Sequence, residues 1–414
     1  MFTDRKVAIV TDSLSTTPDT TAAACPFHTA VTMPFDGTPQ RPSSRFAEWR
    51  AQAPATRMKA SDGNVGWFVT RHALARAVLG DARFSQQPQR FPLGPTRSFG
   101  DADEDALRSI ASGNLLSLDS PQHVKLRRAV IGRFSVKSAQ SHRAAIAAFT
   151  GKQLERFLTH GSPADLYKHY AEPVSVFAHC RVLGIPDDHI EGFTAAYVEE
   201  APLDLMFGFV RTLLDVKKDD LGEDVVSDLL RSELSRHEIE GILTLLMAAG
   251  RDAVAHIIAT GAALLLSRPA QLERLRSEPA LISTAVEEFV RYGGMFVSVF
   301  PRTATEDVVL EGIRIRKGES VWVSPAAANR DERRFANPDE FDVGRDAFGH
   351  LGFGYGTHGC VGQQLARVVI AEAITQLVAG VPSLTLVSAE QDGHLPFAGD
   401  LPTYQTGAVF VAWK

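Results

Sequence analysis

One cysteine near the C-terminus stands in a setting that suits metal chemistry. Cys360 ends the run Phe353-Gly-Tyr-Gly-Thr-His-Gly-Cys360 and is soon followed by Gly362. The glycines within this run free the backbone for positive φ or for close approach to a flat ligand. Residues 363–377 contain no Gly or Pro and predict a helix, so the cysteine lies at a helix start. Unpaired N–H groups and the helix dipole at that position favour a thiolate.

A thiolate held on such a loop is suited to ligate a haem iron, where it pushes electron density towards O–O cleavage. The same glycines also fit a dinucleotide fingerprint, Gly354-x-Gly356-x-x-Gly359. That interpretation needs a buried strand before the loop, which residues 343–350 do not supply. A purely structural cysteine would leave His358 and the glycines unexplained.

The pattern Phe353-Gly-x-Gly-x-His-x-Cys360-x-Gly362 resembles the haem-binding loop of the cytochrome P-450 family, and further matches extend from about residue 54 to the C-terminus. The resemblance implies haem b with its iron ligated by Cys360, and contacts to the cofactor from Phe353, Gly354 and Gly362. It also implies a mainly α fold with a minor β portion and a long central helix over the haem.

Composition agrees with one large domain. The chain has 414 residues, 44% of them hydrophobic, and no linker-like tract divides it after the N-terminal region. We expect residues 1–30 to be a disordered tail and residues 31–414 to form a single catalytic domain. The net charge of −6 gives no sign of nucleic-acid binding. The three scattered cysteines argue against a disulfide framework and for a reducing compartment.

The N-terminus carries no targeting segment and no membrane helix that we recognise. The soluble, bacterial type of the family is therefore the better match. We expect a cytoplasmic protein that does not bind a membrane.

The strongest helical pattern lies mid-chain, at residues 235–267. Ser235-Arg-His-Glu238 is a capping-box signature at its start. Roughly thirty helical residues would span about 45 Å. The segment is nearly as apolar as a membrane span, but Arg251, Asp252 and His256 interrupt its middle and would be costly in lipid. We expect one long buried helix with a polar functional centre.

By resemblance, this helix crosses the oxygen side of the haem. Ala249-Gly250-Arg251-Asp252-Ala253 matches the family pattern of a small residue, Gly, any residue, an acid and Thr. The acid and the threonine ordinarily organise the water that supplies protons, and the glycine leaves room for O₂ and substrate. Asp252 is present, but Ala253 replaces the threonine and has no hydroxyl. Either water fills the space, or the substrate contributes a polar group, or the reaction needs no oxygen insertion.

Glu288-Phe-Val-Arg291 places an acid and a guanidinium one helical turn apart. Such a pair is ordinarily a solvated surface pair, but its apolar neighbours favour burial. By resemblance the pair is structural and locks the core beneath the haem, with Arg345 completing the network.

The two propionates of a haem need cations or hydrogen-bond donors. The segment from Asp119 predicts a helix start that carries His123 and Arg127 four residues apart. By resemblance these two residues bind the propionates. Arg302 and His358 are the other expected donors, and His350 is a further candidate.

Substrate contacts are implied only by region, in the loop at residues 85–114, the segment at 201–209, the long helix, the run at 296–299 and the run at 402–404. The expected pocket residues are Leu246, Ala249, Phe296, Val299 and Thr403. A small β region is expected at residues 308–324, where glycines bound short β-rich runs.

Electrons must come from NAD(P)H through an external partner, because no flavin-binding or iron–sulfur segment is visible. We expect an acidic ferredoxin or flavodoxin to dock on Lys125, Arg128, Arg133 and Arg367, although an ordinary solvated basic face is the alternative. We expect a monomer that acts on a small molecule.

Three functions remain open from the sequence. The first is a haem-thiolate monooxygenase that activates O₂ to oxidise a specialised metabolite. The second is an oxidase of the same fold that couples or cyclises its substrate without inserting oxygen. The third is a non-catalytic haem-binding or sensor protein, against which Asp252 counts.

Overall fold

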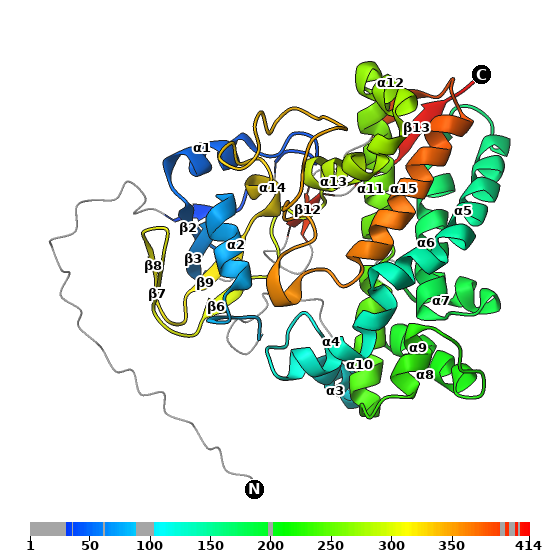
Figure 1. Ribbon diagram of the computed structural model, residues 1–414. Helices are drawn as coiled ribbons and strands as arrows, with labels where there is room; N and C mark the ends of the chain where they lie inside the picture. Colours follow the sequence, from blue (N-terminus) through cyan, green and yellow to red (C-terminus); the bar gives the residue numbers. More distant parts are fainter. Residues whose placement is uncertain are drawn as a thin grey trace, which may run out of the picture.

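The computed structural model describes residues 30–34, 36–60, 63–87, 103–197, 202–389, 394–396, 402–404 and 406–414. Helices dominate these residues, so the predicted mainly α fold with a minor β portion is confirmed. Figure 1 shows most helices gathered on one side and the larger sheet on the other. The tail expected over residues 1–30 lies outside the described residues except for Ala30.

Long helices form the larger part of the molecule. The helix expected from residue 363 is present. The helices are α1 (Ser44–Gln52), α2 (His72–Gly80), α3 (Glu104–Gly113), α4 (Gln122–Ile131), α5 (Val136–Thr159), α6 (Glu172–Leu183), α7 (Ile190–Ala196), α8 (Leu203–Lys217), α9 (Val225–Leu230), α10 (Arg236–Ala249), α11 (Asp252–Leu266), α12 (Pro269–Ser277), α13 (Ile282–Gly293), α14 (Pro325–Ala328) and α15 (Gln363–Gly380).

The larger sheet contains β1 (Val31–Thr32), β2 (Ala55–Lys59), β3 (Val65–Val69), β4 (Phe84–Ser85), β6 (Arg302–Ala304) and β9 (Ser320–Val323). Its order is β1-β2-β3-β9-β6-β4. β2 pairs antiparallel with β3, which runs parallel to β9. β9 is buried along its whole length and carries Trp322, one of the largest fully buried side chains.

Three small sheets complete the fold. The predicted β region after residue 308 is confirmed as an antiparallel pair followed by β9. The small sheets are β7 (Val308–Leu310) with β8 (Ile313–Ile315), β10 (Thr385–Ala389) with β13 (Val409–Ala412) and β5 (Ala164–Asp165), and β11 (His394–Pro396) with β12 (Pro402–Tyr404).

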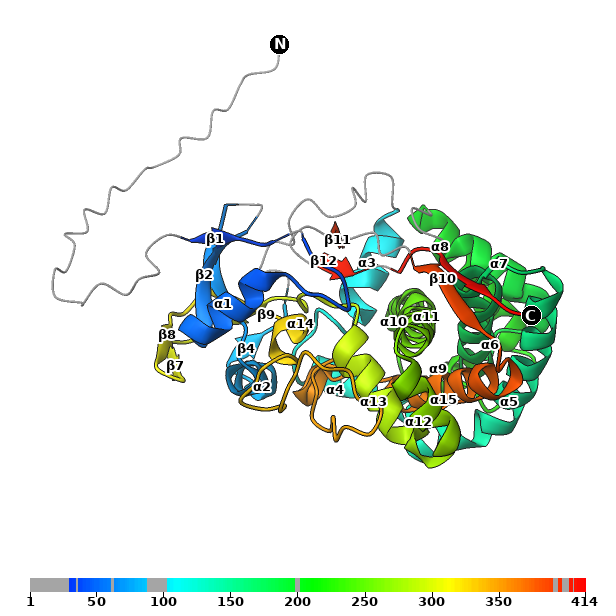
Figure 2. The same cartoon turned by 90° about the horizontal axis from the view of Figure 1, so that it is seen from above.

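The long helix expected at residues 235–267 is interrupted in its middle. The capping box of Ser235 and Glu238 is formed as predicted, but α10 ends at Ala249 and α11 begins at Asp252. Gly250 and Arg251 keep right-handed helical dihedral angles, so the two helices continue along nearly one axis, along which Figure 2 looks. The prediction of one continuous helix is therefore wrong. Glycine weakens a helix, and side chains of a neighbouring helix contact the residues at the interruption.

Residues Arg236–Leu266 are long and apolar enough to cross a membrane by length and composition alone. Most of this segment is buried against other parts of the protein. Ile258, Ala259 and Leu264 are fully buried within the main hydrophobic cluster, as expected for the core helix of a globular fold.

Candidate active site

The cysteine loop is a closed turn that ends where α15 begins. The N–H of Cys360 donates to the Phe353 carbonyl at 2.8 Å, and the N–H of Gly359 donates to the Gly356 carbonyl at 3.0 Å. Gly354 and Gly356 have φ of 68° and 73°, which are unfavourable for residues with a side chain. These glycines therefore allow the turn to bring Cys360 back over Phe353.

Helix α2 holds this loop from the N-terminal part of the chain. A Cβ atom on Gly356 would lie 2.5 Å from the Leu79 carbonyl oxygen, so only glycine permits this approach. The Arg76 guanidinium lies 4.2 Å from the centre of the Tyr355 ring, which adds a cation–π contact. Two segments far apart in the sequence thus build the loop together.

A polar network supports the loop from α13 and α15. The Arg367 guanidinium binds both oxygens of Glu287, at 2.5 and 3.0 Å, and lies 4.6 Å from the centre of the Phe353 ring. His350 accepts from the Gly352 N–H through Nδ1, so its Nε2 carries the proton that is donated to Glu287 at 3.0 Å. Desolvation raises the pKa of Glu287, but these hydrogen bonds outweigh it and lower the pKa to about 2. His350 therefore braces the loop, and its candidacy as a propionate donor is wrong.

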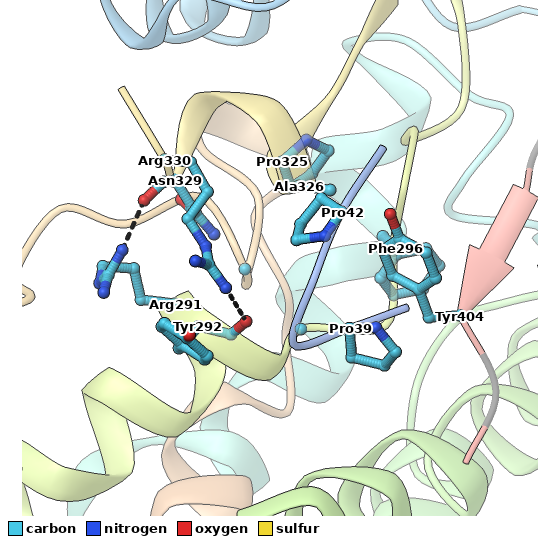
Figure 3. A pocket seen from close by; sticks show the side chains of 12 residues that line it. Pro39, Pro42, Arg291, Tyr292, Phe296, Pro325, Ala326, Asn329, Arg330 and Tyr404 are labelled. Atoms are coloured by element: carbon cyan, nitrogen blue, oxygen red, sulfur yellow. Dashed lines mark hydrogen bonds between the residues drawn. The ribbon is translucent and has the colours of Figure 1, made fainter. Parts of the chain in front are cut away.

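The Glu288–Arg291 pair is completely buried, with both side chains 0% exposed. Arg291 donates to both oxygens of Glu288, at 2.6 and 2.8 Å, and to the carbonyls of Asn329 and Pro338. Figure 3 shows Arg291 reaching towards Asn329. Arg345 also donates to Glu288, at 3.2 Å, as the resemblance implied. The charged groups of this buried pair are therefore hydrogen-bonded, which offsets the cost of removing them from water.

The Asn329 side chain connects this network to the loop. Its Oδ1 accepts from the Leu351 N–H at 2.7 Å, just before the glycine turn. Arg330, the next residue, donates to the Tyr292 carbonyl and lies over the Tyr292 ring at 3.6 Å (Figure 3). The region beneath the loop is therefore rigidly cross-linked to α13.

Three of the four expected propionate donors hold nitrogen atoms that the described residues leave without a partner. These atoms are both ring nitrogens of His123, Nδ1 of His358 and Nε of Arg302, and all are buried. The rings of His123 and His358 lie 4.1 Å apart. Burial, followed by the charges of Arg302 and His123, lowers the pKa of His358 to about 3, and burial lowers that of Arg302 to about 10. Buried donors without partners are costly, so an anionic group here would offset a real penalty.

Arg127, the fourth expected donor, already makes a hydrogen bond within the protein. Its Nη2 donates to the Gly359 carbonyl at 2.6 Å, so Arg127 ties α4 to the cysteine loop. Burial lowers the pKa of its guanidinium, while the nearby Cys360 raises it. The sequence placed Arg127 near the cofactor but did not indicate this contact with the loop itself.

Cys360 is exposed, whereas Cys180 is buried in the core. Desolvation raises the pKa of the Cys360 thiol, although the N–H groups of Gly362 and Gln363 and the charges of Arg127 and Arg367 oppose that rise. The N–H groups at the helix start thus favour the thiolate, as expected, while desolvation opposes it. A metal bound to Cys360 would displace the proton of its thiol.

The middle of the broken helix has an open face of small residues. Ala248 and Ala249 are exposed although the flanking turns are buried, and Gly250 and Ala253 are partly exposed. The Asp252 carboxylate is 52% exposed and accepts from Arg251 Nε at 2.7 Å. The structure thus holds Asp252 by its own neighbour and leaves no side chain hydroxyl at position 253.

Two residues of α6 that the sequence did not indicate engage the break. The Ser175 hydroxyl donates to the Arg251 carbonyl at 2.6 Å. The His179 ring packs so closely that a Cβ on Gly250 would lie 2.1 Å from it. No pattern in the sequence places α6 against this helix, so only tertiary structure reveals these contacts.

The expected pocket residues are only partly brought together. Phe296 and Thr403 are bridge partners, and Val299 follows on the same run, donating its N–H to the Val323 carbonyl. Leu246 is buried in the main cluster, while Ala249 belongs to the open helical face. Residues 88–102 and residue 201 of the expected substrate regions lie outside the described residues.

The arrangement fits a haem. An accessible thiol on a flat glycine turn, unpaired buried donors and an open face of alanines are the features that such a group requires. Among the described residues no group of three or more His, Cys, Asp and Glu side chains could hold a bare metal ion.

Comparison with known proteins agrees with this geometry. A family model described as Cytochrome P450 matches residues 209–379. Cytochrome P450-SU2 of Streptomyces griseolus is 35% identical over 93% of this chain and 97% of its own length. Mycinamicin IV hydroxylase/epoxidase of Micromonospora griseorubida is 34% identical over 83% of this chain and 89% of its own length.

Among solved structures, the chain is similar to the cytochrome P450 enzyme CxnD for C–S bond formation in chuangxinmycin biosynthesis. The TM-score is 0.80 at 28% identity, covering 92% of this chain and 97% of CxnD. The fold, the cysteine loop and nearly full-length similarity to such relatives show that this chain belongs to the cytochrome P450 family, haem-dependent oxidoreductases with a cysteine-ligated iron that take NAD(P)H-derived electrons from a redox partner.

Proposed function

We propose that Cys360 ligates the haem iron and that this P450 monooxygenates a small organic substrate of bacterial specialised metabolism. The unpartnered nitrogens of His123, His358 and Arg302 beside the Cys360 loop carry this assignment, because a haem supplies the two carboxylates that they lack. The activity of relatives such as the mycinamicin hydroxylase/epoxidase supports the substrate class.

When bound, the haem supplies the activation of O₂ with two external electrons. The residues of this chain set the surroundings. Ala248, Ala249 and Gly250 leave space on the long helix for small ligands, and Arg251 fixes the carboxylate of Asp252. The exposed carboxylate of Asp252 lies on this face in contact with solvent.

Replacement of the ligand tests the assignment. Cys360→Ala should abolish the thiolate-type spectrum of the reduced carbonyl complex, whereas Cys180→Ala should retain it, because Cys180 lies in the core. A thiolate-type spectrum in Cys360→Ala would show that another residue ligates the iron.

Ala253 favours a second function, oxidative coupling or cyclisation without oxygen insertion. Such a reaction would remove two hydrogen atoms from the substrate, and O₂ would be reduced to two water molecules with two electrons from the substrate and two from the redox partner. That CxnD, of similar fold, is an enzyme of C–S bond formation supports this alternative. Incorporation of labelled oxygen from O₂ into the product would favour monooxygenation, and its absence would favour coupling.

For the redox partner, an acidic ferredoxin or flavodoxin is the best match to the basic residues of α4. Arg128 is exposed and makes no ion pair with the described residues. Lys125, Arg133 and Arg367 already bind Glu238, Asp228 and Glu287, which weakens their part in the expected docking surface. Reduction rates should fall with ionic strength and in Arg128→Glu. Rates that respond to neither change would contradict this docking surface.

We also infer a cytoplasmic monomer. The unpaired cysteines Cys180 and Cys360 support a reducing compartment. Sedimentation of the haem-loaded protein as a dimer would contradict the monomer.

A further inference from the structure

His256 lies on α11 one turn beyond the Asp252–Ala253 pair, and its side chain is buried with both ring nitrogens bonded. Nε2 lies 2.9 Å from the Gly293 carbonyl oxygen at the end of α13. Nδ1 lies 2.6 Å from the Thr406 hydroxyl, which lies just beyond β12. One imidazole thus joins three separate parts of the chain.

The direction of each hydrogen bond follows from the chemistry of the groups. A carbonyl oxygen only accepts, so Nε2 carries the proton. Burial lowers the pKa of His256 to about 4, so the ring is neutral and Nδ1 accepts from the Thr406 hydroxyl. The Thr406 oxygen then accepts from the Thr260 hydroxyl, 2.8 Å away. The order Thr260, Thr406, His256, Gly293 is therefore fixed.

This chain of hydrogen bonds holds the C-terminal run beside the segment that follows α13. The Tyr404 N–H donates to the Met295 carbonyl at 2.6 Å, and Thr403 is the bridge partner of Phe296. A Cβ on Gly293 would lie 2.9 Å from the Thr260 methyl group, so α11 also packs directly on the end of α13. The position of Thr406 thereby fixes which residue faces Phe296.

A proton relay is the other role that linked hydroxyl and imidazole groups could have. A relay needs an open end that receives or delivers protons. This chain ends in the Gly293 carbonyl, which cannot release a proton, and begins at Thr260, a buried residue of α11. The geometry therefore fits a clamp better than a relay. The clamp is the set of hydrogen bonds that joins Thr260, Thr406, His256 and Gly293 and holds the C-terminal run in place.

We propose that His256, acting through Thr406, is a positioning residue that holds Thr403 opposite Phe296 and hence sets the shape of the substrate pocket. This proposal rests on the proposed function and on the expectation from the sequence that Phe296 and Thr403 line that pocket. His256 touches neither of these two residues in the contacts described, so its effect on specificity is exerted through the C-terminal run.

Two azoles of different size test the proposal on the haem-loaded protein. Imidazole needs little of the pocket, whereas 4-phenylimidazole also fills space beside the iron. Thr406→Val should weaken 4-phenylimidazole binding, followed by the Soret shift, by about 3- to 10-fold, the effect expected for one lost hydrogen bond. Imidazole affinity should stay unchanged. Thr406→Ser, which keeps the hydroxyl, should restore binding of the larger azole.

Thr212→Val is the matched control, because the Thr212 hydroxyl bonds only the Gly208 carbonyl on the exposed side of α8. Hydrogen exchange at Thr403 and Tyr404 should quicken in Thr406→Val and not in Thr212→Val. If Thr406→Val does not fold, His256→Asn decides, since it keeps an acceptor for Thr406 and loses the donor to Gly293.

The outcomes separate the clamp from the proposed function. Wild-type affinity for 4-phenylimidazole and wild-type exchange in Thr406→Val, or in His256→Asn where that variant decides, would overturn the clamp. A wild-type protein that shows no Soret shift with imidazole would instead contradict the proposed haem-thiolate function, while the exchange measurement still reports on the clamp.

Discussion

Ser175 donates a hydrogen bond of 2.6 Å to the carbonyl oxygen of Arg251, at the point where α10 gives way to α11. A helix interruption exposes backbone groups that would otherwise bond within the helix. Ser175 adds a hydrogen bond from a neighbouring helix to the carbonyl of the residue that precedes α11. The break beside Gly250 is therefore stabilised by tertiary structure and does not follow from low helix propensity alone.

Removing this hydroxyl should destabilise the protein. In Ser175→Ala the Arg251 carbonyl, whose residue is buried, loses the hydrogen bond from the hydroxyl, which costs about 0.5–1.5 kcal/mol. Urea unfolding of the haem-loaded protein measures the change. Ser141→Ala is the control, because the Ser141 hydroxyl bonds only the nearby Ser138 carbonyl on an exposed surface. Equal stability of the two variants would contradict a special role for Ser175.

Restoring a hydroxyl at position 253 should alter coupling between electron use and product. If the substrate supplies the missing polar group, Ala253→Thr competes for its place, and product formed per NADPH should fall roughly threefold or more. A ligand screen that follows the Soret band would first identify a substrate. Unchanged product and coupling in Ala253→Thr would remove Ala253 as a mechanistic marker.

Breaking the Glu288–Arg291 pair should be severe, because both side chains are fully buried. Glu288→Gln leaves the Arg291 charge without its counter-ion and should cost about 3–5 kcal/mol in unfolding free energy, with loss of bound haem. Glu104→Gln, in the exposed pair with Arg108, should cost no more than about 0.5 kcal/mol. Similar losses in the two variants would show that burial is not the cause.

Stability should fall as the pH drops below neutrality. Burial lowers the pKa of both His179 and His256 to about 4. Their value in the unfolded chain is about 6.5, so between these limits the unfolded chain binds more protons and folding weakens as pH falls. Each histidine contributes up to about 1.4 kcal/mol per pH unit.

His179→Gln should therefore reduce the slope of unfolding free energy against pH between pH 6.5 and 4. The reduction should be up to about 1.4 kcal/mol per pH unit, which corresponds to one proton. Denaturant unfolding at several pH values measures this slope. An unaltered slope would show that His179 is not kept neutral by the fold.

The sequence was informative where local rules decide structure. The glycine turn before Cys360, the capping box at Ser235 and the Glu288–Arg291 spacing are short-range patterns, and the structure shows each of them formed. The break at Gly250 was missed because Ser175 and His179 lie on another helix.

Contacts between distant segments also explain the other errors. His350 lies in the expected region, but Glu287 and Gly352 use its two nitrogens. The contact of Arg127 with the Gly359 carbonyl was likewise missed, because α4 and the cysteine loop lie far apart in the sequence. Neither effect leaves a pattern in the linear sequence.

The approach of Gly356 to Leu79 has a consequence for how the protein is made. Helix α2 and the loop that it supports lie far apart in the sequence. Contacts of such sequence separation close late in folding. The cysteine can therefore reach its final position only after both segments have been synthesised and have docked, so capture of the haem should follow that docking.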